Sequence, residues 1–190
     1  MTGVKVGPLT KGDLERDVAA IAARFPRVYA TDGPLMCHGS AGGYHSMLMR
    51  KGYDCQKIYE WVPLLDPIDI DGAYTHSSVR VVLEEESFVV DGTYRQFFHG
   101  GKGDSGRNTR REVLPKYFFG TIVEMYHLFR ENTDLLNGGI IRRMRVNGRI
   151  EGDVEEHHIA KLVSELYGVR ITEVCPDAAK KYGQERRALT

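Results

Sequence analysis

Three residues have side chains that together could perform nucleophilic acyl chemistry: Cys37, His76 and Asp91. A cysteine attacks a carbonyl carbon only as its thiolate, so a reactive cysteine needs neighbours that lower its pKa. The positive end of a helix dipole does this, and so does an imidazole that takes up the thiol proton. A carboxylate can then hold the imidazole in the required tautomer. These residue types therefore predict a cysteine nucleophile with a base and an orienting group.

Cys37 lies where a helix is expected to begin. Residues 31–34 have the composition of a turn, and a helix is predicted from Cys37 to about Lys51. Three glycines in its first half weaken this prediction, because glycine is a poor helix former. Gly52 is well placed to cap the end of the helix. A thiol at the start of this helix would feel the positive end of its dipole.

The other two residues belong to a predicted β-hairpin. His76 begins an alternating, β-branched strand at residues 76–84, and Asp91 follows a second strand at residues 87–90. The acidic run at residues 84–86 is expected to form the turn between them. In a hairpin the beginning of the first strand lies beside the end of the second, so His76 and Asp91 are expected to be neighbours. Contact between them also requires a register that puts both side chains on one face.

These segments have the order and character of motifs in a known family. The run from Cys37 to Asp54, with its Lys-Gly-Tyr step, is followed by THSSV at residues 75–79 and by FVVDGTY at residues 88–94. Together they resemble the nucleophile helix, histidine strand and V-D-P-T-Y aspartate motif of the transglutaminase-like superfamily of papain-like enzymes. Gly92 stands where proline is usual, and Ser77 stands where alanine is commoner. The resemblance covers roughly residues 29–98.

The resemblance implies a papain-like core and a thioester acyl-enzyme on Cys37, with His76 as base and Asp91 as its orienter. The acyl donor would be a protein, a peptide or a carrier-bound substrate, and the acceptor an amine or water. No cofactor is implied. The backbone N–H of Cys37 would stabilise the oxyanion together with a second donor. Candidates for that donor are Tyr29, His38, Tyr44 and Trp61, and Gln96 is a candidate for lining the cleft.

Three functions remain open at this point. The first is an acyl transferase that passes the acyl group to an amine. The second is a hydrolase with the same three residues, either a protein-glutamine deamidase or a cysteine peptidase, because the acceptor depends on whether the site excludes water. The third is a binding module that kept the fold without the chemistry. In that case Cys37 is only a small buried hydrophobe.

Other residues that could bear chemistry give weaker signals. His38 and His45 are nearer to Cys37 in sequence, but only residues three or four apart share a helix face. With the pair His157-His158 they offer metal ligands, yet the spacings match no zinc pattern, and we predict no metal site. The His157-His158 pair is expected to lie on a solvated helix face.

Bulk composition limits the class of protein. A chain of 190 residues with 42% hydrophobic residues suits one domain with a real core. Its 26 basic and 26 acidic residues balance, which gives no sign of nucleic-acid binding. Three separated cysteines and the lack of a secretory signal or long apolar run predict a cytoplasmic protein without a membrane span. A bacterial effector delivered without a signal peptide would have the same features.

The order of predicted elements indicates an α+β fold, with N-terminal helices packed on an antiparallel sheet and further helices after it. The remaining predictions are helices at residues 14–25 (with Asp13 as N-cap), 121–131 and 154–167, a strand at residues 55–62, and a hairpin around Asn147-Gly148. Residues 1–176 are predicted to form a single domain. Residues 177–190 are predicted to be a charged tail of disordered composition.

Overall fold

The computed structural model describes residues 8–24, 36–65, 74–98, 114–136, 138–146 and 152–188. Its strands are β1 (Asp54–Trp61), β2 (Thr75–Leu83), β3 (Glu86–Asp91) and β4 (Phe118–Gly120). Its α-helices are α1 (Lys11–Arg24), α2 (Met36–Arg50), α3 (Ile122–Glu131), α4 (Gly138–Val146), α5 (Glu156–Tyr167), α6 (Ile171–Val174) and α7 (Pro176–Ala188). Short 3₁₀ turns are η1 (Pro63–Leu65), η2 (Tyr94–Phe97) and η4 (Thr133–Leu135).

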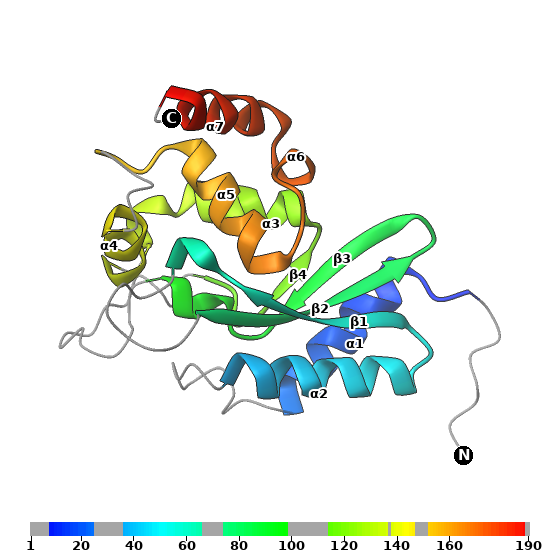
Figure 1. Ribbon diagram of the computed structural model, residues 1–190. Helices are drawn as coiled ribbons and strands as arrows, with labels where there is room; N and C mark the ends of the chain where they lie inside the picture. The colour runs from blue at the N-terminus through cyan, green and yellow to red at the C-terminus, as the bar shows by residue number, and fades with distance from the viewer. Residues whose placement is uncertain are drawn as a thin grey trace, which may run out of the picture.

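The described chain is a mixed α+β fold around one antiparallel sheet, as predicted. The four strands follow the order β1-β2-β3-β4, so each pairs with its neighbour in sequence. Helices α1 and α2 cover one face of the sheet, and α3 and α5 cover the other (Figure 1). The sheet therefore separates the N-terminal helices from the C-terminal ones.

The alternation of side chains in the sheet divides the core into two clusters. Val79 and Val81 of β2, with Val90 of β3, pack with α1 and α2. Val89 points the other way, into the larger cluster formed with α3 and α5. Because both faces are covered, both β2 and β3 carry buried residues at successive positions rather than a simple alternation.

Helix α2 forms in spite of its glycines, because its other side chains supply a packing face. Tyr44 and Leu48 are 2% and 0% exposed and belong to the cluster beneath β2. The predicted end is confirmed: Gly52 has φ of 90°, and its N–H donates to the Met49 carbonyl at 3.0 Å. The N–H of Tyr53 donates to Leu48 at 3.2 Å. This pair of hydrogen bonds is the Schellman arrangement, which needs a left-handed residue.

The predicted start of the first helix was wrong by one turn. Helix α1 begins at Lys11, and the cap is Thr10 rather than Asp13. The Thr10 hydroxyl accepts from the Asp13 N–H at 3.2 Å, and the Asp13 carboxylate accepts from the Thr10 N–H at 3.1 Å. Asp13 is thus the reciprocal partner of Thr10 in a capping box. An acidic side chain suits this third helical position as well as it suits the cap itself.

Two predictions for the C-terminal part were also wrong. The first strand predicted for the hairpin, residues 144–146, is instead the end of helix α4, and Met144 is fully buried. Asn147-Gly148 lies outside the described residues. The charged tail predicted at residues 177–190 is helical as far as Ala188. Helix α7 packs against α5 with Ala178 in the core, and its alanine, lysine, glutamate and arginine residues are good helix formers.

The end of α5 offers a test of how closely the helix lies on the sheet. Gly168 caps α5 in the left-handed conformation, with φ of 61°, and a Cβ there would overlap the Glu60 side chain of β1. We expect Gly168→Ala to lower the free energy of unfolding by about 1–3 kcal/mol, because the left-handed strain and the overlap add. Chemical denaturation measures this loss.

Two variants separate the causes of that loss. Gly152→Ala has left-handed strain alone, because Gly152 has φ of 93° and a Cβ added there would meet nothing within 4 Å. The loss at Gly168 should shrink when Glu60 is also replaced by alanine. An equal loss with and without the Glu60 side chain would contradict the close approach of α5 to β1.

Candidate functional site

The hairpin of β2 and β3 brings His76 and Asp91 onto one face of the sheet. Val79 pairs with Val90, so the same register places Ser78 opposite Asp91. His76 is two residues before Ser78 and therefore shares its face, diagonal to Asp91. The His76 Nε2 lies 2.7 Å from the Asp91 Oδ2, and the two side chains are 0% and 1% exposed. The neighbour relation predicted from sequence is confirmed.

The Asp91 carboxylate is held by donors on both of its oxygens. Its Oδ1 accepts from the Thr93 backbone N–H at 2.7 Å and from the Thr93 hydroxyl at 3.0 Å. Its Oδ2 accepts from His76 and also from the Tyr167 hydroxyl, at 2.8 Å. Burial alone would raise the pKa of Asp91, but the charge and hydrogen bond of His76, with the Thr93 and Tyr167 donors, hold it below its usual value.

The His76 ring is enclosed by aromatic side chains and by its ionic neighbours. Phe97 and Tyr167 pack edge-on against it, with ring centroids 5.0 and 5.5 Å away. Burial disfavours the imidazolium, but the charge and hydrogen bond of Asp91, together with Cys37, outweigh this and raise the pKa of His76 to about 9. This environment therefore favours the protonated form of His76. Because Nε2 faces Asp91, Nδ1 is the nitrogen left for the sulfur.

Cys37 reaches this pair from the other face of the sheet. It is the second residue of α2 and 3% exposed. Burial would raise the pKa of the Cys37 thiol, but its hydrogen bond with His76, the charge of His76 and the Ser77 backbone N–H outweigh burial and lower it. The start of α2 adds the positive end of a helix dipole. We call Cys37, His76 and Asp91 the Cys–His–Asp cluster, and its arrangement suits a thiolate beside an imidazolium.

The predicted substrate-side residues differ in how they lie around the cluster. Gln96 contacts it, with Nε2 3.4 Å from the His76 Nδ1. His38 is exposed beside it, with Nδ1 3.4 Å from the hydroxyl of Ser77. Trp61 is 56% exposed on the edge strand β1. Tyr44 is instead part of the core, where packing accounts for it. Tyr29 lies outside the described residues.

Two residues that hold the cluster were missed in the sequence. Thr93 had a readable signal, because an Asp side chain often accepts from the backbone N–H two residues later. Tyr167 had none, since it is 76 residues from Asp91 and lies on a helix whose docking the sequence does not reveal. Its hydroxyl is nevertheless one of the closest partners of the carboxylate.

The other residues that could bear chemistry do not gather into a second site. His157 and His158 are buried at the start of α5, 1% and 7% exposed, so the predicted solvated face was wrong. The His158 ring accepts from the Glu155 N–H at 3.0 Å, which explains its position as part of a helix cap. Among the described residues, no group of three or more His, Cys, Asp or Glu side chains is arranged to hold a metal ion.

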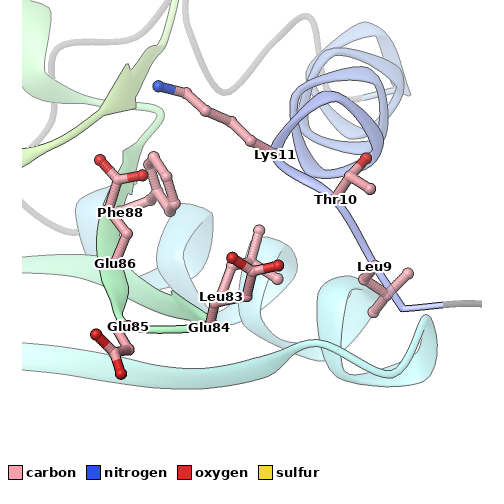
Figure 2. A pocket seen from close by; sticks show the side chains of 8 residues that line it. All are labelled: Leu9, Thr10, Lys11, Leu83, Glu84, Glu85, Glu86 and Phe88. Atoms are coloured by element: carbon pink, nitrogen blue, oxygen red, sulfur yellow. The ribbon is translucent and has the colours of Figure 1, made fainter.

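A cavity of about 380 Å³ lies away from the cluster, between the start of α1 and the turn of the β2–β3 hairpin. Figure 2 shows Leu9, Thr10 and Lys11 on one side of it, and Phe88 with three glutamates of the hairpin on the other. Its lining is Leu9, Thr10, Lys11, Leu83, Glu84, Glu85, Glu86 and Phe88. None of these is a cysteine or a histidine, so the cavity supplies neither the nucleophile nor the base that acyl chemistry needs.

Two further findings concern the whole of the described chain and its comparison with known proteins. In the part of the chain that the structure covers, every helix is too short or too polar to span a bilayer. A scan against protein-family models and searches of curated proteins and solved structures found no match to this chain.

Proposed function

We propose that this protein is a cysteine-dependent acyl transferase of the transglutaminase-like kind. The observation that carries the proposal is the Cys–His–Asp cluster: a thiol at a helix start in hydrogen-bond contact with a buried imidazole that a carboxylate holds. A nucleophile, its base and an orienting group in contact are the parts that covalent acyl chemistry needs. The resemblance of residues 29–98 to transglutaminase-like motifs points to the same reaction.

The proposed reaction has two half-reactions. His76 takes the proton of Cys37 at Nδ1, and the thiolate attacks the carbonyl carbon of an amide or thioester donor. The tetrahedral intermediate collapses as the bond to the leaving group breaks; the imidazolium gives its proton to that group, and a thioester on Cys37 remains. An amine then attacks the thioester and loses a proton to His76 as the new bond forms. The sulfur leaves, and the thiolate–imidazolium pair is restored.

The cluster offers groups for stabilising the oxyanion of that intermediate. The backbone N–H of Cys37 belongs to the first turn of α2, and N–H groups at a helix start point towards the end of the helix where an anion is favoured. Gln96 is half-buried and presents its carboxamide to His76, which makes it the best placed of the predicted residues to donate a second hydrogen bond. We assign Gln96 that role within the proposal.

Exposed aromatic side chains beside the cluster favour a peptide or protein as the substrate. Tyr59 and Trp61 are 58% and 56% exposed. They lie on β1 opposite Ser77 and Thr75 of β2, so their side chains share a face of the sheet with Ser77. The Ser77 N–H in turn contacts the Cys37 sulfur. A pair of exposed rings on an edge strand provides apolar area that an extended peptide can cover.

A product assay tests the proposal and separates it from hydrolysis. The protein is incubated with a glutamine peptide, and ammonia and peptide mass are measured with and without a primary amine. We expect ammonia release with incorporation of the amine. Ammonia with a mass gain of about 1 Da and no amine incorporation would indicate a deamidase. A cut backbone would indicate a peptidase, and no change with glutamine or thioester donors would contradict acyl chemistry.

The reactivity of Cys37 towards iodoacetamide should depend on pH differently from that of the other thiols. An ordinary cysteine thiol has a pKa of about 8.5. Because the pKa of Cys37 is lowered, we expect iodoacetamide to alkylate it at a clearly lower pH than an ordinary thiol. Cys55 is an internal control, because burial and the nearby charge of Asp54 raise its pKa. Peptide-resolved mass spectrometry measures each site. If all the thiols react only above about pH 8, the protein is better described as a binding module that kept the fold.

A further inference from the structure

We infer that Tyr167, on helix α5, is a positioning residue for the proposed reaction: its hydroxyl fixes the Asp91 carboxylate in the orientation that accepts from His76. The inference rests on the proposed function, because positioning matters only if His76 acts on Cys37. Tyr167 lies outside every motif that pointed to the cluster.

The geometry around Asp91 leaves the carboxylate one orientation. Thr93 supplies two donors to Oδ1, and Tyr167 and His76 share Oδ2 at 2.8 and 2.7 Å. Without the Tyr167 hydroxyl, the only partner left at Oδ2 would be His76, the group that the carboxylate has to orient. The Tyr167 ring also packs edge-on against the imidazole, with ring centroids 5.5 Å apart. One side chain thus constrains both members of the pair.

The backbone of Tyr167 is fixed to the sheet by its own contacts. Arg80 of β2 donates to the Tyr167 carbonyl at 3.2 Å. The next residue, Gly168, approaches Glu60 of β1 so closely that a side chain would not fit there. Glu165, two residues earlier, accepts from the Leu64 N–H at 2.7 Å. The last turn of α5 is therefore held by β1, β2 and η1 together, and the hydroxyl has little freedom to leave Asp91.

The hydroxyl remains a donor throughout the working pH range. Tyr167 is 1% exposed, and burial with the negative charge of Asp91 raises its pKa well above the ordinary value for tyrosine. The effect on Cys37 is transmitted by His76. An Asp91 carboxylate held in place favours the imidazolium, and the imidazolium lowers the pKa of the Cys37 thiol more than the direct charge of Asp91 raises it.

The test is Tyr167→Phe in the full chain, with iodoacetamide alkylation of Cys37 followed against pH. We expect the acid limb of the alkylation profile to move upward by about half to one pH unit, since one hydrogen bond to the charged Asp91 is lost. With a donor that the product assay has validated, kcat should fall about tenfold, whereas KM should change less than twofold. A merely structural role would lower the thermal midpoint and leave the alkylation profile unchanged.

Tyr126→Phe is the matched control. Tyr126 is a buried tyrosine of the same core cluster, but its hydroxyl lies near Cys175 rather than near Asp91. Its replacement should leave the alkylation profile of Cys37 at the wild-type position. A double variant adds a second check: in an Asp91→Asn background, Tyr167→Phe should have no further effect on the profile. Additive effects of the two substitutions would contradict action through Asp91.

A second replacement keeps the volume of the side chain and reverses the expected sign. Incorporation of 3-fluorotyrosine at position 167 makes the hydroxyl a stronger donor, so the acid limb should move to lower pH. This result keeps the test informative if Tyr167→Phe folds poorly. If wild-type Cys37 reacts as an ordinary thiol, the proposed function fails. If wild-type Cys37 has a lowered pKa but neither replacement moves the profile, only the role of Tyr167 fails.

Discussion

Cys37→Ala is expected to reduce turnover to background while leaving the fold intact. Without the sulfur no thioester can form, and loss of a nucleophile in other triads costs on the order of 10⁴–10⁶-fold in kcat. The structural cost is small. Cys37→Ala removes one sulfur atom, which is about as large as a methylene group. Loss of a buried group of this size costs roughly 1 kcal/mol of the free energy of unfolding, which lowers the thermal midpoint by about 2–4 °C. Activity and thermal unfolding are measured on the same preparation.

The other thiols provide matched controls for this variant. Cys55 and Cys175 are also free and partly buried, and neither belongs to the cluster. Cys55→Ala and Cys175→Ala should keep activity within about twofold, since substitutions away from special features have small effects. A folded Cys37→Ala protein with wild-type turnover would rule out the mechanism. Loss of turnover in all three variants alike would point to a structural cause instead.

Asp91→Asn is expected to lower kcat by about 10²–10⁴-fold, in line with the loss of orienting groups in other triads. The reason is visible in the hydrogen bonds. The carboxylate accepts from Thr93 on one oxygen and from His76 and Tyr167 on the other. The Asn carboxamide differs, because its oxygen only accepts hydrogen bonds and its NH₂ group only donates them. If its oxygen keeps the Thr93 bonds, its NH₂ group faces His76 Nε2 and drives the ring to the tautomer with the proton on Nδ1, where it can no longer receive the proton of Cys37.

The control for this substitution is Asp17→Asn, which removes a carboxylate that accepts from Lys51 and from the Tyr53 hydroxyl, each at 2.8 Å. It should leave kcat near wild type, because neither partner of Asp17 belongs to the cluster. Nitrogen-15 NMR of the His76 ring can report its tautomer directly in wild type and in Asp91→Asn. An effect of Asp91→Asn below tenfold, with an unchanged tautomer, would mean that packing by Phe97 and Tyr167 is sufficient to orient the ring.

Much of the local structure around the cluster was predictable because it depends on short-range rules. The helix after the turn, its glycine cap and the hairpin that pairs β2 with β3 all followed from periodicity and turn residues. His76 and Asp91 are only 15 residues apart, so a single hairpin defines their relation. What the sequence left open was the face on which they meet, because a shift of one residue in register would have separated them.

The parts that sequence reasoning missed depend on tertiary packing. The tail after Pro176 has the charge content of a disordered segment. It is nevertheless a helix docked on α5, because Ala178 lies in the core, Lys161 lies over the Tyr182 ring and Lys181 pairs with Glu155. Polar His158 is buried because its ring completes a helix start. Tyr44 looked like a substrate contact but faces the sheet, since the helical phase of α2 relative to the strands is set by packing rather than by composition.

The hydrogen bond between Tyr167 and Asp91 closes a span of 76 residues, and under the proposed function it sets the size of the smallest fragment that we expect to react. A piece that ended after β4 would contain all three residues of the cluster and every motif of the resemblance. It would also leave His76 and Asp91 without the helix that covers them, open to water on that side. Under the proposed function, synthesis from the N-terminus would complete the nucleophile and its base early and cover them only when the final third of the chain folds onto the sheet.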